Sequence, residues 1–283
     1  MTSSSNDPRI ELARHTIGDV TVIADPALPP RLLRLTDAHG NDYLAKHHTD
    51  PTRYAAETHA YRTWGRHLTE HLPELISHHD ASHTLLFTAV PGRNADTLPP
   101  DTAEEEQTHH DAGLVLALLH RATSEPPAAG AIGAELAVRL HTWVSRAERA
   151  DLLSTAERRL LLEIADQLAG TRMDSTVCHL DYQPRNWLYA PGNLWVCDLE
   201  HMRRDARIRD FARLAFRRWQ TAPHLRTAFF TGYGARLTSS DEQLLESFGA
   251  IEAATAIVRG HERDDAALTT HGRTALSRLS RPL

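Results

Sequence analysis

The chain of 283 residues lacks the features that mark secreted, membrane-spanning and nucleic-acid-binding proteins. It has only two cysteines, too few for a disulfide framework, and we expect both to be reduced and buried. There is no run of about 18 apolar residues, and the polar N-terminus has no hydrophobic leader, so we expect a cytoplasmic protein. A net charge of −6 leaves no overall basic field, so we expect neither nucleic acid nor an anionic membrane as a partner.

Motifs for zinc are also missing, although the chain has 19 histidines. Neither H-E-x-x-H nor C-x-x-C occurs. The adjacent pairs His47-His48, His78-His79 and His109-His110 would point in different directions on a strand or helix. We therefore assign the histidines to surface and capping roles.

Lysine is the scarcest charged residue, because the 31 basic side chains comprise 30 arginines and one lysine, Lys46. In a chain that uses arginine almost everywhere, the remaining lysine suggests a position that needs a compact ammonium and not a planar guanidinium. Chance could also leave one lysine anywhere. Lys46, however, falls at the end of an expected strand, where it alternates with Leu44.

Of the residues present, 41% are hydrophobic, enough for a substantial core. After a flexible tail over residues 1–10, periodicity predicts strands first and helices later. The expected strands cover residues 21–25, 31–37, 42–48, 74–79 and 83–90, with a helix over about 52–68. Beyond Pro99-Pro100 we expect a helix from Asp101, a loop over 124–133, and helices over about 134–150 and 155–169.

Four polar residues in the middle of the chain stand next to short apolar strands. His179, Asp181 and Asn186 form H-x-D-x-x-x-x-N, and Asp198 opens D-x-E after a hairpin. One carboxylate to accept a hydroxyl proton, with an amide oxygen and a second carboxylate for Mg²⁺, is what phosphoryl transfer to an alcohol requires. Turn-capping in an ordinary hairpin would explain any one of these residues, but the four in this order favour a kinase site.

This stretch resembles the aminoglycoside phosphotransferase-type branch of the protein-kinase-like fold, which also includes choline and other small-molecule kinases. The resemblance implies that Asp181 is the catalytic base and that Asn186 and Asp198 are ligands of Mg²⁺. It also implies that His179 buttresses the loop and that Glu200 assists the metal.

The sequence departs from the family pattern in two places. Leu180 stands where the family often has glycine, and Cys178 and Cys197 flank the motif, which we interpret as changes of packing. No glycine-rich loop precedes Lys46, where residues 25–31 read DPALPPR. A glycine-rich loop lets the backbone approach phosphates closely, so its absence leaves the phosphate-covering segment and the nucleotide less defined than the reaction.

The family places a phosphate-binding lysine where Lys46 stands, and the resemblance implies that Glu57 pairs with it. Eleven residues separate the two, which allows a turn and the start of a helix lying across the sheet. Taken alone, Glu57 would be one more solvated helix charge. The run LLFTAVPG further implies that main-chain groups near Thr88 and Val90 bind the adenine.

The resemblance implies an α+β, bilobal, protein-kinase-like fold. The expected N-lobe covers residues 1–92, with a five-stranded sheet and one helix, and the expected C-lobe covers residues 93–283, with the catalytic loop and the acceptor site. ATP, or alternatively GTP, would bind between the lobes with Mg²⁺, in a monomer or dimer. Asp210 resembles the structural aspartate that ties down the catalytic loop, although a plain helix N-terminal carboxylate explains it equally well.

A basic cluster follows the motif and bears on the acceptor; it comprises Arg203, Arg204, Arg207 and Arg209. These arginines are either a solvated face or part of a pocket for an anionic acceptor. Family members that bind aminoglycosides tend to use acidic pockets, so the cluster argues against a highly cationic substrate. Acidic residues further along leave such a substrate open, namely Asp241, Glu242, Glu246 and Glu252.

The expected activity is ATP-dependent phosphorylation of a small-molecule hydroxyl, with antibiotic inactivation as the leading role by family analogy. The alternative within the same chemistry is a metabolic or biosynthetic kinase for an amino alcohol, a sugar or a nucleoside-like molecule. A nucleotide-binding pseudokinase is a further alternative. The missing glycine loop is its only support, and the intact Asp181, Asn186 and Asp198 oppose it.

Overall fold

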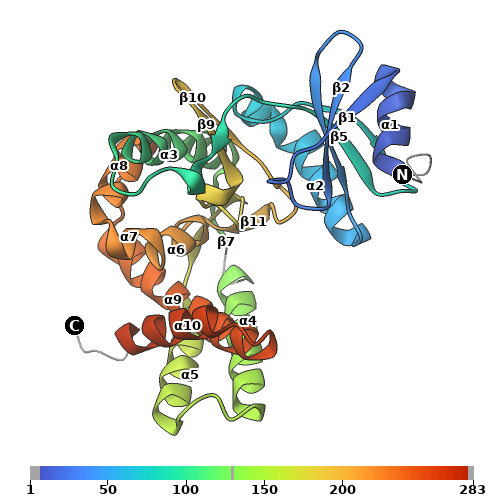
Figure 1. Cartoon of the computed structure of the whole chain (residues 1–283). Helices are drawn as coiled ribbons and strands as arrows, with labels where there is room; N and C mark the ends of the chain where they lie inside the picture. The colour runs from blue at the N-terminus through green and yellow to red at the C-terminus, as the bar shows by residue number, and fades with distance from the viewer. Residues whose placement is uncertain (1–6, 129–130, 280–283) are drawn as a thin grey trace.

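The computed structural model describes residues 7–128 and 131–279, which form two lobes (Figure 1). The N-terminal lobe is built on an antiparallel sheet of five strands in the order β1-β2-β3-β5-β4. The strands are β1 (Val20–Ile23), β2 (Leu32–Asp37), β3 (Asp42–His47), β4 (Leu75–His79) and β5 (Thr84–Thr88). Each lies within one residue or two of an expected strand, because the alternation of apolar residues and the turns between them are local signals.

A helix precedes the first strand, where a flexible tail was expected. Helix α1 (Pro8–Ile17) begins after Asp7, whose carboxylate accepts a hydrogen bond from the backbone N–H of Arg9. Its apolar face joins the sheet in a small core made of Ile10, Leu12, Ala13, Leu35, Ala45 and Leu86. The expected tail is therefore wrong for residues 8–10, while residues 1–6 lie outside the described residues.

The second helix, α2 (Pro51–Thr63), covers the opposite face of the sheet. Successive strand residues point to opposite faces, so Leu86 on β5 packs on the α1 side, whereas Leu85 and Phe87 pack with Tyr54 of α2. By the same alternation, Ala45 belongs to the α1 side and Lys46 faces α2. The helix is shorter than the expected range of about 52–68, because two short 3-10 turns, η1 (Gly65–His67) and η2 (Thr69–His71), follow it.

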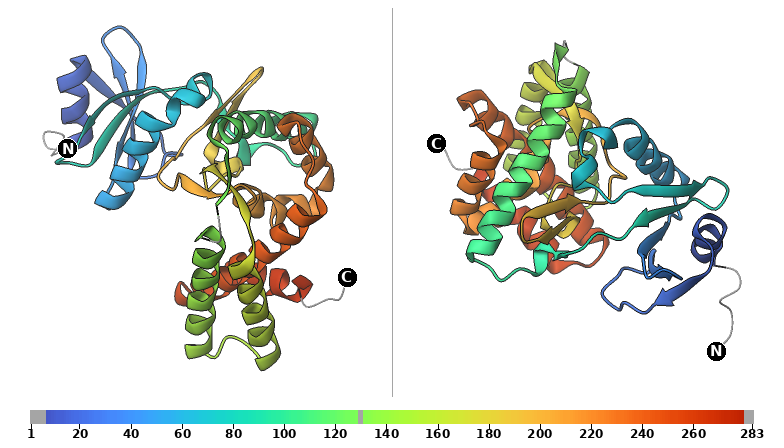
Figure 2. Two further views of the ribbon diagram at one scale, coloured as in Figure 1. Left: turned by 180° about the vertical axis from the view of Figure 1, so that it is seen from behind. Right: turned by 90° about the horizontal axis from the view of Figure 1, so that it is seen from above.

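The C-terminal lobe is mainly helical. Its helices are α3 (Ala103–Thr123), α4 (Ala131–Arg149), α5 (Thr155–Gly170), α6 (Arg209–Ala215), α7 (Arg218–Thr221), α8 (Pro223–Tyr233), α9 (Ser239–Glu262) and α10 (Ala266–Leu279). They pack in pairs, α3 with α8, α4 with α5 and α9 with α10. Figure 2 shows α4 and α5 as a hairpin that extends away from the N-terminal lobe. None of the helices in the described part of the chain is long and apolar enough to cross a bilayer.

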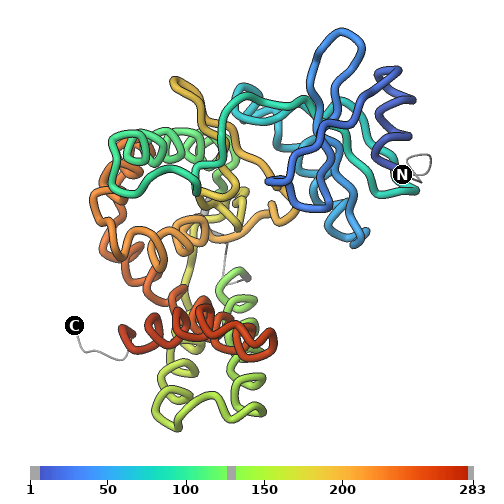
Figure 3. Tube along the Cα trace, in the orientation of Figure 1, coloured from blue at the N-terminus to red at the C-terminus, as the bar shows by residue number. Residues whose placement is uncertain are grey.

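Two three-stranded sheets lie in the middle of this lobe, in the orders β10-β9-β6 and β11-β8-β7. Their strands are β6 (Arg93–Asn94), β7 (Glu125–Ala128), β8 (Met173–Cys178), β9 (Trp187–Ala190), β10 (Asn193–Val196) and β11 (Arg203–Ala206). Figure 3 traces the chain from α5 back to the centre, where β8 begins. Strand β7 corrects the expected loop over 124–133, because residues 125–128 pair with β8; residues 129–130 of that loop lie outside the described residues.

Helices α3 and α8 approach unusually closely because each carries a glycine at the crossing. A Cβ atom on Gly113 would lie 2.0 Å from the carbonyl oxygen of Phe229, and one on Gly232 would lie 1.9 Å from that of His110. Only glycine fits at such a backbone-to-backbone contact. The close crossing sets the relative position of His120 on α3 and Tyr233 on α8, two residues that support the site described next.

Candidate active site

The loop after β8 is anchored by a buried carboxylate, Asp210, at the start of α6. Its two oxygens accept hydrogen bonds from the backbone N–H groups of His179, at 2.8 Å, and Leu180, at 2.6 Å. His120 contacts the same carboxylate at 3.1 Å and also contacts the hydroxyl of Tyr233 at 2.9 Å. Burial alone would raise the pKa of Asp210, but the contacts of its carboxylate with His120, His179 and Leu180 together outweigh burial and lower that pKa. Asp210 is therefore a loop anchor and not a plain helix-terminal carboxylate.

The anchored loop holds Leu180 in the left-handed backbone region, with φ of 62°. A residue with a Cβ atom adopts this region at a cost of roughly 1–2 kcal/mol, whereas glycine adopts it freely. This backbone gives a physical reason for a glycine preference at this position. In this chain, the two hydrogen bonds to Asp210 hold the strained backbone in place.

His179 links the loop to the end of β10. Its Nε2 lies 3.1 Å from the carbonyl oxygen of Cys197, and its Nδ1 accepts a hydrogen bond from the backbone N–H of Asp181 at 3.3 Å. These partners suit a neutral ring with its proton on Nε2, and burial lowers the pKa of His179 accordingly. Both cysteines are free thiols; Cys178 is buried as expected, whereas Cys197 is only half-buried by surface exposure, which corrects the expectation for it. Desolvation raises the pKa of Cys197 to about 12.

Asp181 is buried and surrounded by donors. Its carboxylate accepts hydrogen bonds from Gln183 at 2.6 Å, Arg185 at 2.7 Å and the side-chain amide of Asn186 at 2.9 Å, and it forms an ion pair with Arg213. The side-chain nitrogen of Asn186 is directed to Asp181, so the Oδ1 atom of Asn186 is left for another partner. No donor in residues 7–128 or 131–279 is hydrogen-bonded to that oxygen.

The solitary lysine lies between two carboxylates. Lys46 Nζ is 2.6 Å from Glu57 Oε2 on α2 and 2.6 Å from Asp198 Oδ1, and its side chain is only 5% exposed. Burial alone would lower the pKa of Lys46, but the two carboxylates outweigh it, and the pKa is raised. Glu57 also accepts the backbone N–H of Leu199 at 3.2 Å, so α2 is tied to the segment that carries Asp198.

The sequence reasoning missed three basic residues around these carboxylates. Arg31 lies 2.9 Å from Asp198 Oδ2, Arg53 lies 2.7 Å from Glu200 Oε1, and His48 Nε2 lies 2.7 Å from Glu57 Oε2. Arg31 ends the proline-containing segment that replaces a glycine-rich loop, so this segment places a guanidinium in the site. Nothing marked it in advance, because it is one of 30 arginines.

One cavity of about 630 Å³ is lined by four of the expected residues, namely Asp181, Asn186, Asp198 and Glu200. This volume lies within the range of about 300–1,000 Å³ that small-ligand sites occupy. An amide oxygen and carboxylates in one cavity are the hard oxygen donors that Mg²⁺ prefers, so the residues present fit that ion.

The residues expected near the adenine lie at the end of β5. The N–H of Thr88 donates to the carbonyl oxygen of Glu74 at 3.0 Å, so this donor is used within the N-terminal lobe. Val90 follows two residues later, outside the strand, and neither residue lines the cavity. Their contact with a nucleotide stays a prediction.

Comparison with known proteins gives a consistent result. The model of the APH family, described as the phosphotransferase enzyme family, matches residues 19–245. No curated protein sequence matches the chain. Among solved structures, the gentamicin complex of APH(2″)-IIa is similar over 97% of this chain and 97% of that chain, with 14% identity and a TM-score of 0.65.

Two further structures come from different kinases. Choline kinase LicA from Streptococcus pneumoniae is 13% identical over 94% of this chain and 96% of that chain, with a TM-score of 0.67. Macrolide 2′-phosphotransferase MphH from Brachybacterium faecium is 17% identical over 93% and 94%, with a TM-score of 0.62. The expected α+β, bilobal, kinase-like fold is confirmed by these similarities.

Proposed function

We propose, from the premise that this chain belongs to the phosphotransferase enzyme family and acts on a hydroxyl acceptor, that it transfers the γ-phosphate of ATP to a small molecule. The observation that carries the proposal is that Asp181, Asn186 and Asp198 line one cavity. Asp198 is in turn paired with Lys46, which Glu57 holds from behind, outside the cavity lining. We assign nucleotide binding to residues 1–92 and acceptor binding to residues 93–283.

In this proposal Asp181 is the base. The acceptor hydroxyl oxygen attacks the γ-phosphorus, the bond to the bridging oxygen breaks, and ADP leaves with the electron pair. The hydroxyl proton passes to the carboxylate of Asp181 as the new bond forms. Gln183 and Asn186 hold that carboxylate in one orientation through their amide groups. His179, which touches Asp181 only through the backbone, positions the loop.

The phosphate side is assigned to the basic residues of the N-terminal lobe. Lys46, held by Glu57, and Arg31 would contact the nucleotide phosphates, where a pre-positioned cation stabilises the charge of the transition state. Mg²⁺ held by Asn186 and Asp198, with Glu200 nearby, would neutralise further phosphate charge. GTP could replace ATP in the same chemistry, since none of these contacts involves the purine ring of the nucleotide.

The acceptor class is a finer part of the proposal. The similar structures include both antibiotic kinases and a choline kinase, so the antibiotic role expected by analogy stays a proposal. A metabolic or biosynthetic acceptor is the second candidate, and the arginine-lined pocket described below favours it. A pseudokinase is disfavoured, because Asp181, Asn186 and Asp198 line a single cavity.

The test is nucleotide consumption across a panel of antibiotics and hydroxylated metabolites, with ATP and GTP measured separately. We expect phosphorylated product with at least one acceptor, and a loss of about 10³-fold or more in kcat for Asp181→Asn. The exposed Asp174→Asn, on β8, is the matched control and should retain full activity. Asp181→Asn should still bind the nucleotide, as measured by calorimetry. Near wild-type turnover in that variant would refute the base assignment.

A further inference from the structure

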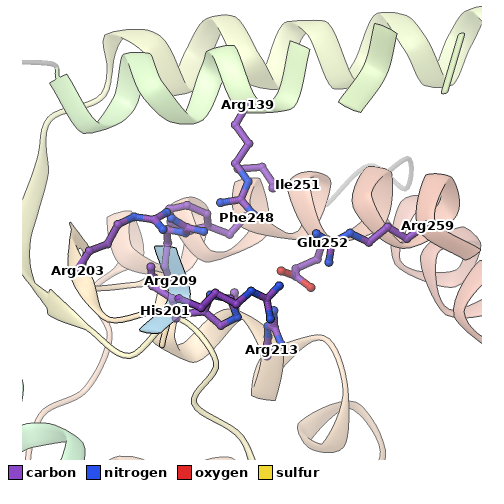
Figure 4. A pocket seen from close by; sticks show the side chains of 12 residues that line it. Arg139, His201, Arg203, Arg209, Arg213, Phe248, Ile251, Glu252 and Arg259 are labelled. Carbon is purple, nitrogen blue, oxygen red and sulfur yellow. The ribbon is translucent and has the colours of Figure 1, made fainter. Parts of the chain in front are cut away.

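Beside the catalytic cavity lies a narrower pocket of about 140 Å³ (Figure 4). Its charged lining consists of six arginines, one histidine and one carboxylate, namely Arg53, Arg139, Arg203, Arg209, Arg213, Arg259, His201 and Glu252. Figure 4 shows Arg139 reaching from α4 toward α9, with Arg203 and Arg209 on one side of it and Glu252 with Arg259 on the other. Elements far apart in the sequence, namely α4, β11, α6 and α9, therefore bring guanidinium groups to one small space.

The pocket has more guanidinium charge than the protein neutralises. Arg203 and Arg209 share a single carboxylate, that of Asp205. Arg259 lies over the ring of Trp143, 5.4 Å from its centroid. Arg139 has no hydrogen bond or ion pair with any residue in the described ranges.

The surroundings of Arg139 disfavour its charge. Burial, and then the like charges of Arg209 and Arg203, lower the pKa of Arg139 to about 10, and the smaller opposing effects of the Glu252 and Asp205 carboxylates do not offset them. At neutral pH the group is still protonated, so a partly buried cation without a partner faces two others. An anion between these groups would relieve the repulsion, and a guanidinium presents paired N–H donors that match the oxygens of a carboxylate, phosphate or sulfate.

The pocket adjoins the cavity that Asp181 lines. Arg139, Arg213 and Glu252 line both this pocket and the larger cavity, and Arg213 is ion-paired with Asp181. Arg31, Asn186 and Asp198 line the larger cavity but not the narrow pocket, which therefore lies to one side of these groups assigned to the nucleotide phosphates and Mg²⁺. Arg53, which is paired with Glu200, lines both spaces. A group bound there would be carried by the acceptor and would place the rest of that molecule beside Asp181.

We propose that the acceptor is an anion, a hydroxyl compound whose phosphate, sulfate or carboxylate group binds between Arg139, Arg203 and Arg209. This inference rests on the proposed kinase function and names the class of its acceptor. The pocket is much smaller than the 300–1,000 Å³ of a typical small-ligand site, so it suits one charged substituent and not a whole acceptor. The hydroxyl-bearing part would lie in the larger cavity.

Some residues of the basic cluster and of the acidic group noted in the sequence line this pocket, and the others do not. Only Arg203 and Arg209 of the four clustered arginines line the pocket, while Arg204 pairs with Glu125 and Arg207 with Asp241. Of the four acidic residues, Glu252 alone lines it. A polycation or a quaternary ammonium would therefore meet several guanidinium groups and one carboxylate.

The first experiment measures anion binding directly, with the nucleotide site filled by Mg²⁺ and a non-hydrolysable ATP analogue. Sodium sulfate is titrated against sodium chloride at matched ionic strength, and binding is followed by calorimetry and thermal melting. We expect sulfate to bind the wild type and to bind Arg139→Gln about tenfold more weakly or worse. Arg149→Gln, an exposed arginine of the same helix, is the matched control and should bind as the wild type does. Arg203→Gln supplies a second variant.

Sulfate that binds no better than chloride, or equally well to Arg139→Gln and Arg203→Gln, would overturn the proposal. The second experiment compares sugar phosphates and hydroxy acids with their neutral parents and with amino sugars and choline as acceptors. We expect the highest kcat/KM for an anion, and a rise of about tenfold in its KM in Arg139→Gln with little change in kcat. The proposed anionic acceptor would also be refuted if a cationic compound had the highest kcat/KM and if Arg139→Gln raised that value. The proposed kinase function would stand in that case. Sulfate binding without turnover of any acceptor would count against the kinase function instead.

Discussion

The two ends of the cleft treat positive charge in opposite ways. At the end that we assign to the nucleotide, Lys46 lies between Glu57 and Asp198, and Arg31 contacts Asp198. At the end that we assign to the acceptor, six arginines line a pocket with a single lining carboxylate, and Arg139 has no ion-pair partner within the described residues. The first end has its charges already ordered within the protein, whereas the second, under our proposal, has its charges balanced only when an anionic acceptor binds.

The acid–base properties of the two cations express this difference. The carboxylates around Lys46 raise its pKa in spite of burial. Burial and neighbouring arginines lower the pKa of Arg139 to about 10. A cation whose charge the fold favours is typical of a preorganised element, and one whose charge the fold disfavours is typical of a site that a ligand completes.

The largest expected effect comes from removing a charge at the end assigned to the nucleotide. Asp198→Asn removes the carboxylate that Lys46 and Arg31 share and the ligand assigned to Mg²⁺. We expect kcat to fall about 10³-fold or more, measured with whichever acceptor the panel identifies, against about tenfold in KM for Arg139→Gln. If Asp198→Asn kept activity within tenfold of wild type, the two ends would not differ as argued.

Acid should also weaken the ordered end first. Burial would raise the pKa of Asp198, but Lys46 and Arg31 outweigh it and hold that pKa well below its usual range of about 3.9. The unfolded chain then takes up the proton more readily, so the stabilisation is present above about pH 4 and is lost as the pH falls below it. Urea unfolding between pH 3 and 6, in roughly half-unit steps, should show this loss. The free energy of unfolding should fall less steeply with decreasing pH in Asp198→Asn than in the wild type. Equal slopes in both proteins would contradict the assignment.

The smallest expected effect is a change of stability in Arg139→Gln, at the end assigned to the acceptor. Because Arg139 is partly buried beside like charges, Arg139→Gln should stabilise the free protein by about 1 kcal/mol or less in chloride buffer. In sulfate the order should reverse, since only the wild type gains from anion binding. Arg149→Gln should change neither value. Thermal melting in the two buffers provides the measurement, and a destabilised Arg139→Gln in chloride would show that its charge already has a partner.

Local signals explain which parts of the fold could be predicted. The strands around Lys46 were found because apolar alternation and turn residues act over a few positions, and α1 was missed although Asp7-Pro8 is a helix-start pair. Strand β7 was missed because residues 124–133 read as a Pro/Ala/Gly loop. Its pairing with β8 depends on a partner strand about fifty residues away.

The resemblance that H-x-D-x-x-x-x-N and D-x-E carry implied the family and the fold, and the residue types in these motifs, with the solitary lysine, indicated the class of reaction. Those features lie within short segments, where backbone geometry determines which side chains meet. Tertiary structure alone decided which of 30 otherwise equivalent arginines face the cleft. Arg31, Arg139 and Arg259 come from a loop and two helices more than a hundred residues apart, and only the packing of those elements brings their charges to one site.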